Sequence, residues 1–232
     1  MEHTNEISPD HAETDHDNAE AARAVHAPRD PGAVEEFWDA RYADMAQLWS
    51  GHPNGTLLTE MQDLPAGRAL DVGCGEGADA LYLAEHGWRV TALDVSQVAI
   101  NRAVAQAAVR KVTVNWLHAG LVDAALPRAS FDLVSAQYPA LLRTDENVAE
   151  HALLAAVAPN GVLLFVHHPA PTKEEAAAHG FHVDDYVGPA QVAALLDDSW
   201  QVEVDETRPR HVATGAGSHH THDVVLRARR LR

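Results

Sequence analysis

From about residue 68 onward, short apolar runs alternate with longer segments in which apolar residues recur at helical spacing. This alternation is typical of a parallel sheet that is covered by helices on both faces. We therefore predict an α/β fold with a doubly wound, mostly parallel, seven-stranded sheet. The expected strands are residues 68–72, 89–93, 113–117, 131–136, 162–166, 201–205 and 223–228, and the helices between them are residues 78–86, 97–108, 146–157 and 190–196.

The connection between the last two expected strands differs from the others. Residues 206–222 contain Pro209, Gly215 and Gly217 but no apolar period that would form a helix. Two strands joined without a crossover helix pair as an antiparallel hairpin. We therefore expect an antiparallel last strand at the end of the sheet.

The N-terminal part divides at about residue 30. Residues 1–30 are acidic and have almost nothing to bury, so we predict a disordered acidic tail followed by one domain, residues 31–232. Pro31 suits the first turn of a helix, and apolar residues recur after it at helical spacing. With a second short helix at 57–64, residues 31–64 are expected to form a helical cap.

Charge and composition narrow the possible functions. A formal net charge of -17 disfavours binding to a phosphate backbone. No apolar run reaches the roughly 20 residues of a membrane-spanning helix, and the acidic start does not resemble a signal peptide. The single cysteine, Cys74, suits a reducing compartment. We expect a cytoplasmic monomer or homodimer that binds neither nucleic acid nor membrane.

The strongest chemical signal is an apolar strand that runs into a glycine-rich turn and then a helix, in the sequence Ala69-Leu70-Asp71-Val72-Gly73-Cys74-Gly75-Glu76-Gly77-Ala78. Glycines let the backbone bend sharply and approach a ligand closely. The same turn satisfies a permissive dinucleotide fingerprint, so a nicotinamide cofactor is the competing interpretation. Asp71 favours S-adenosyl-L-methionine (SAM), because a carboxylate there repels a pyrophosphate but attracts an ammonium group.

A second carboxylate, Asp94, ends the next strand, where it can accept hydrogen bonds from both hydroxyls of a ribose. Leu-Asp-Val-Gly-Cys-Gly-Glu-Gly and the later Val-Thr-Ala-Leu-Asp-Val-Ser resemble the first two motifs of the class I SAM-dependent methyltransferases, which have a Rossmann-like fold. The resemblance covers about residues 37–229. It implies contacts to the methionine part of SAM from Asp71, Gly73, Cys74 and Gly75, a ribose contact from Asp94, and Val95 beside the adenine.

Two further segments extend this resemblance. Residues 131–137 are similar to the fourth-strand motif, which implies that Gln137 and Tyr138 line the site near the methyl group. After the third strand the family commonly has an acidic residue near the adenine amino group, whereas this sequence has Gly120. The backbone amide of Leu121 is then the expected adenine contact.

Upstream of the glycine turn, Trp38-Asp39-Ala40-Arg41-Tyr42 and Trp49 loosely resemble the cap of the tellurite-resistance and thiopurine methyltransferase branch. This resemblance implies a helix that closes over SAM, with Trp38, Arg41, Tyr42 and Trp49 near the cofactor or the acceptor. Aromatic faces suit a sulfonium cation or a flat acceptor, and closure excludes water. The alternative is that Trp38 and Tyr42, one turn apart, only pack the helix onto the domain.

Histidines gather at the same end of the predicted sheet. His167 and His168 follow the fifth strand, and ligands of parallel sheets bind beyond the carboxyl ends of the strands. We therefore name His167 and His168 as candidate general bases, with Tyr138 beside them. The hairpin histidines should reach the same edge, where several imidazoles are able to bind a transition metal. No established metal-ligand spacing supports such a site, so no metal ligand is predicted.

These features together predict a SAM-dependent methyltransferase that acts on a sulfur, selenium, tellurium, oxygen or nitrogen atom of a small molecule. The acidic surface and the absence of a separate recognition domain favour a small acceptor over RNA or DNA. Two alternatives stay open on the sequence alone. One is a non-catalytic SAM-binding or histidine-mediated metal-binding sensor, and the other is a nicotinamide-dependent oxidoreductase, which Asp71 disfavours.

Overall fold

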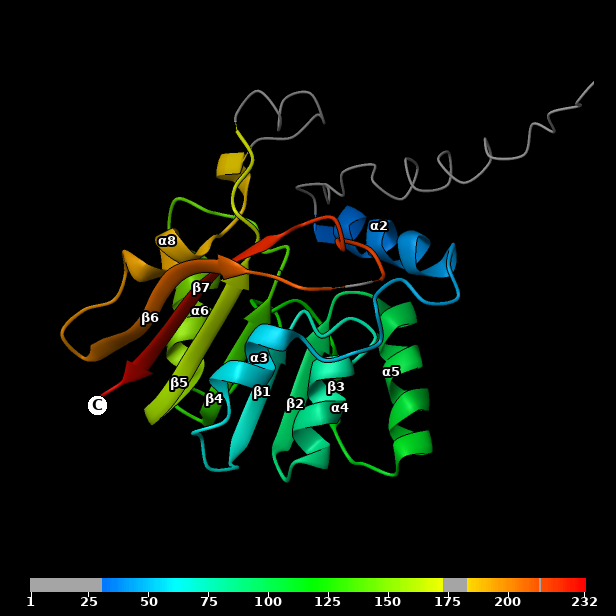
Figure 1. Ribbon diagram of the computed structural model, residues 1–232, viewed down its shortest axis with the longest axis horizontal. Coiled ribbons are helices and arrows are strands. Elements are labelled where there is room, and N and C mark those ends of the chain that lie inside the picture. The colour runs from blue at the N-terminus through cyan, green and yellow to red at the C-terminus, as the bar shows by residue number, and fades with distance from the viewer. Residues whose placement is uncertain (1–30, 173–182, 213) are drawn as a thin grey trace, which may run out of the picture.

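The computed structural model describes residues 31–172, 183–212 and 214–232, and the predicted tail, residues 1–30, lies outside the described residues. A seven-stranded sheet with the order β3-β2-β1-β4-β5-β7-β6 forms the centre of the fold (Figure 1). The strands are β1 (Arg68–Val72), β2 (Arg89–Asp94), β3 (Asn115–His118), β4 (Phe131–Gln137), β5 (Val157–His167), β6 (Trp200–Pro209) and β7 (His222–Arg230). The helices are α2 (Pro31–Ala43), α3 (Gly55–Glu60), α4 (Ala78–Glu85), α5 (Gln97–Arg110), α6 (Val148–Ala156) and α8 (Pro189–Ala193), with a short 3-10 helix η1 (Val183–Asp185).

The sheet confirms the predicted fold class. Strands β1 to β5 pair in parallel, and β7 pairs antiparallel with both β5 and β6. The last two strands are therefore the expected antiparallel hairpin, placed so that β7 lies inside the sheet and β6 forms its edge.

Several expected boundaries differ from the structure by a few residues, and the largest difference is at the start of β5. Residues 157–161 were predicted as the end of a helix and a loop, but they already belong to β5. Pro159 explains the difference, because a proline disfavours helical backbone at the preceding residue, Ala158. The helix α6 thus ends at Ala156, and the chain enters the strand directly.

Two apolar cores lie on opposite faces of the sheet. On one face, α3 and α4 contribute Leu57, Met61 and Leu83 to a core that contains Leu133 and Leu164 of the central strands. On the other face, the core contains residues of α6 and α8 together with β1, β4 and β5. This double covering explains why β4 is buried along almost its whole length.

The helix α2 lies at the end of the sheet where the parallel strands finish, beside α5 (Figure 1). Tyr42 and Leu48 form a small third core with Ala99 of α5. The carboxylate of Asp39 accepts hydrogen bonds from Ser96 Oγ at 2.6 Å and from the Val98 N–H at 3.1 Å. Asp39 therefore adds a second cap to the N-terminus of α5 and ties α2 to it.

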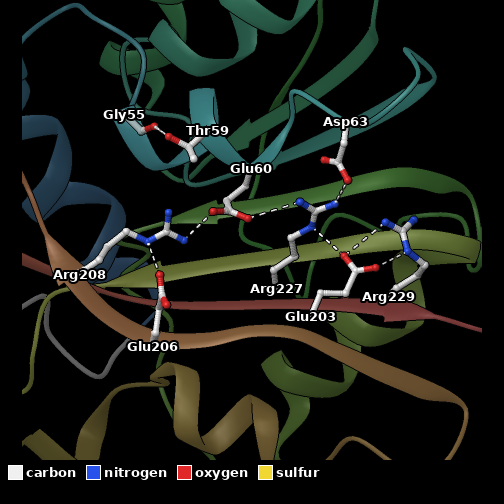
Figure 2. A network of polar contacts seen from close by, with 9 residues as sticks. All are labelled: Gly55, Thr59, Glu60, Asp63, Glu203, Glu206, Arg208, Arg227 and Arg229. Atoms are coloured by element: carbon white, nitrogen blue, oxygen red, sulfur yellow. Dashed lines mark hydrogen bonds and ion pairs between the residues drawn. The ribbon is translucent and has the colours of Figure 1, made fainter.

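Figure 2 shows an ion-pair network that joins α3 to the hairpin of β6 and β7. The guanidinium of Arg227 contacts Glu60 at 3.4 Å, Asp63 at 2.8 Å and Glu203 at 2.8 Å. Glu60 also pairs with Arg208. Because Glu60 and Arg227 are both buried, this network fixes α3 against the hairpin more firmly than surface pairs would.

Within the described ranges, none of the helices is long and apolar enough to cross a membrane.

Candidate active site

A cleft of about 1820 Å³ lies beyond the carboxyl ends of the parallel strands. Ligand pockets usually measure about 300 to 1,000 Å³, so this cleft has room for a cofactor and an acceptor together. It brings together all fifteen residues named from the sequence: Trp38, Arg41, Tyr42, Trp49, Asp71, Gly73, Cys74, Gly75, Asp94, Val95, Leu121, Gln137, Tyr138, His167 and His168.

The glycine turn after β1 has the conformation that its sequence requires. Gly73, Gly75 and Gly77 have φ values of 70°, 52° and 86°, a region that side chains disfavour. The N–H groups of Gly73 and Cys74 both donate to the carbonyl oxygen of Leu93, at 2.9 and 3.0 Å. These bonds hold the turn against the end of β2.

Asp71 lies buried below this turn and is 2% exposed. Among the residues that the structure describes, its Oδ2 has no hydrogen-bond partner. Burial raises the pKa of Asp71 well above its usual value, and the nearby carboxylates of Asp79 and Asp94 raise it further. A buried carboxyl with one oxygen that has no partner among the described residues, beside two other carboxylates, favours binding of a cation at this point of the cleft.

Asp94 at the end of β2 is held in a fixed orientation. Its Oδ2 accepts a hydrogen bond from the Gly75 N–H at 2.8 Å, and its Oδ1 accepts one from the Ser96 N–H at 2.9 Å. Burial raises the pKa of Asp94, and these two hydrogen bonds oppose the shift. Since each carboxylate oxygen accepts two hydrogen bonds, one position on each oxygen is left for the hydroxyls of a ribose.

At the adenine end predicted from the sequence, Val95 and the buried Leu121 line the cleft. A Cβ atom on Gly120 would lie 3.2 Å from Oδ2 of Asp123. Asp123 is exposed and is not among the residues that line the cleft, so the Leu121 N–H stays the predicted adenine contact.

The cap lies directly on the glycine turn. A Cβ atom on Gly75 would lie 2.9 Å from the hydroxyl oxygen of Tyr42 and 3.2 Å from Nε1 of Trp49. The indole N–H of Trp49 donates to that hydroxyl at 2.8 Å, and burial raises the pKa of Tyr42 well above its usual value. Tyr42 therefore stays protonated, and the cap aromatic residues both pack α2 down and line the cleft.

The cap is tied to the turn by two residues that the sequence analysis did not name as site residues. Glu76 accepts hydrogen bonds at 3.1 Å from the backbone N–H groups of both Leu48 and Trp49. Arg102 of α5 donates to Glu76 at 2.9 Å and to the carbonyl oxygen of Tyr42 at 2.7 Å. These contacts fix the loop after α2 at the mouth of the cofactor turn.

The opposite wall of the cleft is built around Tyr138, whose φ of 54° is strained for a residue with a side chain. Its hydroxyl donates to Asp223 Oδ1 at 2.8 Å and accepts a hydrogen bond from Arg210 Nε at 3.0 Å. Thr56 donates to the other oxygen of Asp223 at 2.9 Å. Burial is the main cause that raises the pKa of Tyr138. The predicted catalytic hydroxyl is thus fully engaged and stays protonated.

Gln137, which precedes Tyr138 on β4, is buried, and its Nε2 donates to Ser135 Oγ at 3.1 Å. Its Oε1 has no hydrogen-bond partner within the described part of the chain. Gln137 therefore presents an unsatisfied acceptor to the cleft that it lines.

The expected convergence of histidines is confirmed in part. The ring of His168 stacks between those of Tyr138 and His220, with centroid distances of 4.3 Å and 3.6 Å. The ring of His219 lies next to that of His220, at 4.1 Å between centroids. His211 also lines the cleft. No group of three or more His, Cys, Asp or Glu side chains within residues 31–172, 183–212 and 214–232 is placed to hold a metal ion.

The surroundings of the two candidate bases bear on the role predicted for each. Burial, then the neighbouring His220 and Arg210, lower its pKa to about 2, and a group with such a pKa accepts a proton from an acceptor poorly. His167 Nδ1 lies 3.0 Å from the His168 nitrogen and 3.4 Å from the His168 carbonyl oxygen, and the shorter contact, in which Nδ1 accepts the His168 N–H, favours the neutral tautomer with its proton on Nε2. Burial also lowers the pKa of His167. His167 thus offers the cleft a donor.

Comparison with known proteins agrees with this geometry. Residues 69–161 match the methyltransferase domain family. An uncharacterized methyltransferase of Mycobacterium tuberculosis is 33% identical over 136 residues, 58% of this chain and 68% of that protein. Nodulation protein S of Bradyrhizobium diazoefficiens is 30% identical over 189 residues, 78% of this chain and 77% of that protein. Probable thiol methyltransferase 2 of Arabidopsis thaliana is 33% identical over 100 residues, 38% of this chain and 42% of that protein.

Among solved structures, the N-methyltransferase NodS from Bradyrhizobium japonicum in complex with S-adenosyl-L-homocysteine (SAH) has a similar fold. The TM-score is 0.58 at 22% sequence identity, covering 76% of this chain and 85% of that chain. The chain belongs to the class I SAM-dependent methyltransferases. It is accordingly an enzyme whose cofactor is SAM, and the unpaired Oδ2 of Asp71 and the remaining acceptor positions of Asp94 fit that molecule.

Proposed function

We propose that this enzyme transfers the methyl group of SAM to a small-molecule nucleophile that enters the cleft already deprotonated, with a thiolate as the favoured acceptor class. The wall around Tyr138 carries the proposal. Among the described residues of this wall, the Tyr138 hydroxyl is engaged, the pKa of His168 is lowered to about 2, and His167 presents an N–H. None of the three is suited to remove a proton from an acceptor.

Asp223 is the carboxylate that contacts Tyr138, and both of its oxygens accept hydrogen bonds. It receives hydrogen bonds from Thr56 and Tyr138, and Arg210 Nε lies 3.5 Å from its Oδ1. A carboxylate paired in this way orders the wall. An acceptor that had to lose a proton during the reaction would find no partner for it there.

A thiolate removes this difficulty. SAM supplies a methyl group that is already activated by its positive sulfur. The lone pair of the thiolate forms the new bond to the methyl carbon while the old carbon–sulfur bond breaks, and its electron pair stays on the departing sulfur. No proton has to move, so positioning is the main task of the protein.

In this proposal, each named residue has a role that the chemistry requires. The turn of Asp71, Gly73, Cys74 and Gly75 holds the methionine part, while Asp94, Val95 and Leu121 hold the nucleoside. Gln137 and Tyr138 form the floor next to the methyl group, and the Nε2–H of His167 donates to the anionic acceptor. The cap residues Trp38, Tyr42 and Trp49 exclude water.

The relatives support a small acceptor without choosing the atom. One is named a probable thiol methyltransferase, and NodS is named an N-methyltransferase. An amine that is protonated in solution must lose a proton before it attacks, whereas a thiol with a pKa near that of cysteine is partly ionised at neutral pH. Because none of the described groups around Tyr138 is suited to accept a proton, sulfur is favoured over nitrogen.

The decisive experiment compares the pH dependence of turnover for two thiols of different acidity, using labelled SAM. If the acceptor must arrive as an anion, the rising limb of kcat/KM follows the ionisation of each thiol and shifts by the difference between their pKa values. His168→Ala should leave the position of this limb unchanged. A limb that stays at one pH for both thiols and disappears in His167→Ala or His168→Ala would restore a protein base and reject the proposal.

The binding half is tested separately by calorimetry with SAM, SAH and NAD. SAM and SAH should bind and NAD should not, because Asp71 repels a pyrophosphate. Asp94→Ala should weaken the binding of SAH by roughly tenfold or more, since it removes charge-assisted hydrogen bonds to the ribose. SAH binding that is unaffected by Asp94→Ala would show that the nucleoside lies elsewhere.

A further inference from the structure

Arg41 on α2 lines the cleft, and no described residue forms an ion pair or a hydrogen bond with its side chain. Its Nε is buried and has no hydrogen-bond partner among the described residues. Three other guanidinium groups line the cleft, and each is paired with a carboxylate: Arg102 with Glu76 at 2.9 Å, Arg110 with Glu85 at 3.6 Å and Arg210 with Asp223 at 3.5 Å. Burial lowers the pKa of Arg41, which agrees with a charge that the free protein leaves uncompensated.

The backbone of the glycine turn gives the complementary observation. A carboxylate that binds near a helix N-terminus usually takes backbone N–H groups. Here the N–H groups of Gly73 and Cys74 donate to Leu93, that of Gly75 donates to Asp94, and that of Gly77 donates to Cys74. These four donors of the turn are already used within the protein.

SAM itself carries one ammonium and one carboxylate on its methionine part. Asp71 provides an unpaired negative group for the ammonium. Arg41 immediately precedes Tyr42, whose hydroxyl lies against Gly75. We infer that Arg41 binds the carboxylate of the methionine part, so that the cap recognises the cofactor by charge as well as by packing. A planar guanidinium and a carboxylate form two parallel hydrogen bonds, which makes arginine suited to this task.

The inference predicts a specific pattern of ligand affinities. Calorimetry should compare SAH with 5′-methylthioadenosine, which lacks the amino-acid part, on the wild type and on Arg41→Met, which keeps most of the side-chain length. Arg41→Met should weaken the binding of SAH by roughly tenfold to a hundredfold and leave the affinity for 5′-methylthioadenosine within about twofold of the wild type. Arg41→Lys should recover part of the SAH affinity, because it restores the charge without the planar fork.

Two further arms identify the ligand group and exclude a general effect of charge. Decarboxylated SAM keeps the ammonium, so the preference of the wild type for SAM over this analogue should vanish in Arg41→Met. Arg110→Met removes a cation of the cleft that already has a partner, and it should change the affinity neither for SAH nor for 5′-methylthioadenosine.

Unchanged SAH binding by Arg41→Met would overturn the inference. Equal losses for SAH and 5′-methylthioadenosine would also overturn it, because they would indicate a displaced cap. The measurement needs no acceptor, so its failure would leave the thiolate proposal untouched, and failure of the thiolate proposal would leave this inference untouched.

Discussion

Gly215 lies where the loop between β6 and β7 contacts the loop after α2. Replacing it by alanine should push the two loops apart. Its φ is 91°, and a Cβ atom there would lie 2.6 Å from the backbone nitrogen of Ser50 and 2.9 Å from the carbonyl carbon of Trp49. Both contacts are with backbone, which cannot rotate away. The hydrogen bond from the Ala216 N–H to the carbonyl oxygen of Leu48, at 3.1 Å, would break as the loops separate.

The magnitude follows from two contributions. Positive φ in a residue with a side chain costs about 1 to 3 kcal/mol. Loss of the hydrogen bond costs about 1 kcal/mol more. Gly217 provides the matched control, because its φ is 75° but a Cβ atom there would meet only side-chain atoms at 3.8 and 3.9 Å. Gly217→Ala therefore carries the backbone strain without the collision.

Both variants should lower Tm, by about 2 to 4 °C per kcal/mol for a protein of this size. Only Gly215→Ala should weaken SAH binding, by roughly tenfold in calorimetry, because it displaces the segment that carries Trp49 over Gly75. Gly217→Ala should stay within about twofold of the wild type. Equal SAH affinities for the two variants would show that contact between the loops does not hold the cap, and the reasoning would fail.

Three further perturbations test the buried charges. Asp71→Asn should raise the Tm of the free protein at pH 7 and weaken the binding of SAM. Because the pKa of Asp71 is raised in the folded protein, its ionisation lowers the stability as the pH rises from about 4 to that pKa. The gain in Tm should therefore shrink in acid, and a gain that does not depend on pH would contradict this. Glu150→Met should raise the free energy of unfolding in urea by about 1 to 3 kcal/mol, because neither carboxylate oxygen of this fully buried residue has a partner among the described residues. A loss of stability would show that the carboxylate does have a partner. Arg227→Met should cost about 3 kcal/mol by the same measurement, and a change below about 1 kcal/mol would mean that Glu60 is satisfied by Arg208 alone.

The fold and the cofactor half of the site could be predicted from sequence because their signals are local. The strand β1 begins and ends where the apolar run of residues 68–72 begins and ends, and the glycines of the turn follow at once. The chain from Arg68 to Asp94 contains one complete strand–helix–strand unit. Periodicity and turn chemistry are therefore enough to bring these residues to one end of the sheet.

The acceptor wall could not be predicted in the same way, because its contacts join distant parts of the chain. Thr56, Tyr138, Arg210 and Asp223 come from four different elements, and their meeting depends on the register of the hairpin of β6 and β7. The sequence placed His167 and His168 correctly at the cleft. It contained no signal that stacking and burial would lower the pKa of His168 to about 2.

The distribution of satisfied and unsatisfied polar atoms in the cleft separates the groups that hold the protein from those that face its ligands. Glu76, Arg102 and Asp223 satisfy one another or the backbone, whereas Asp71 Oδ2 and Arg41 Nε have no partner among the described residues. Burying unpaired groups is unfavourable, so the free protein is less stable than its core alone would allow. A ligand that pairs with both groups removes that cost only in the folded state. SAH at a hundredfold excess over its Kd should then stabilise the protein by about 2.7 kcal/mol, which corresponds to a rise in Tm of about 5 to 11 °C.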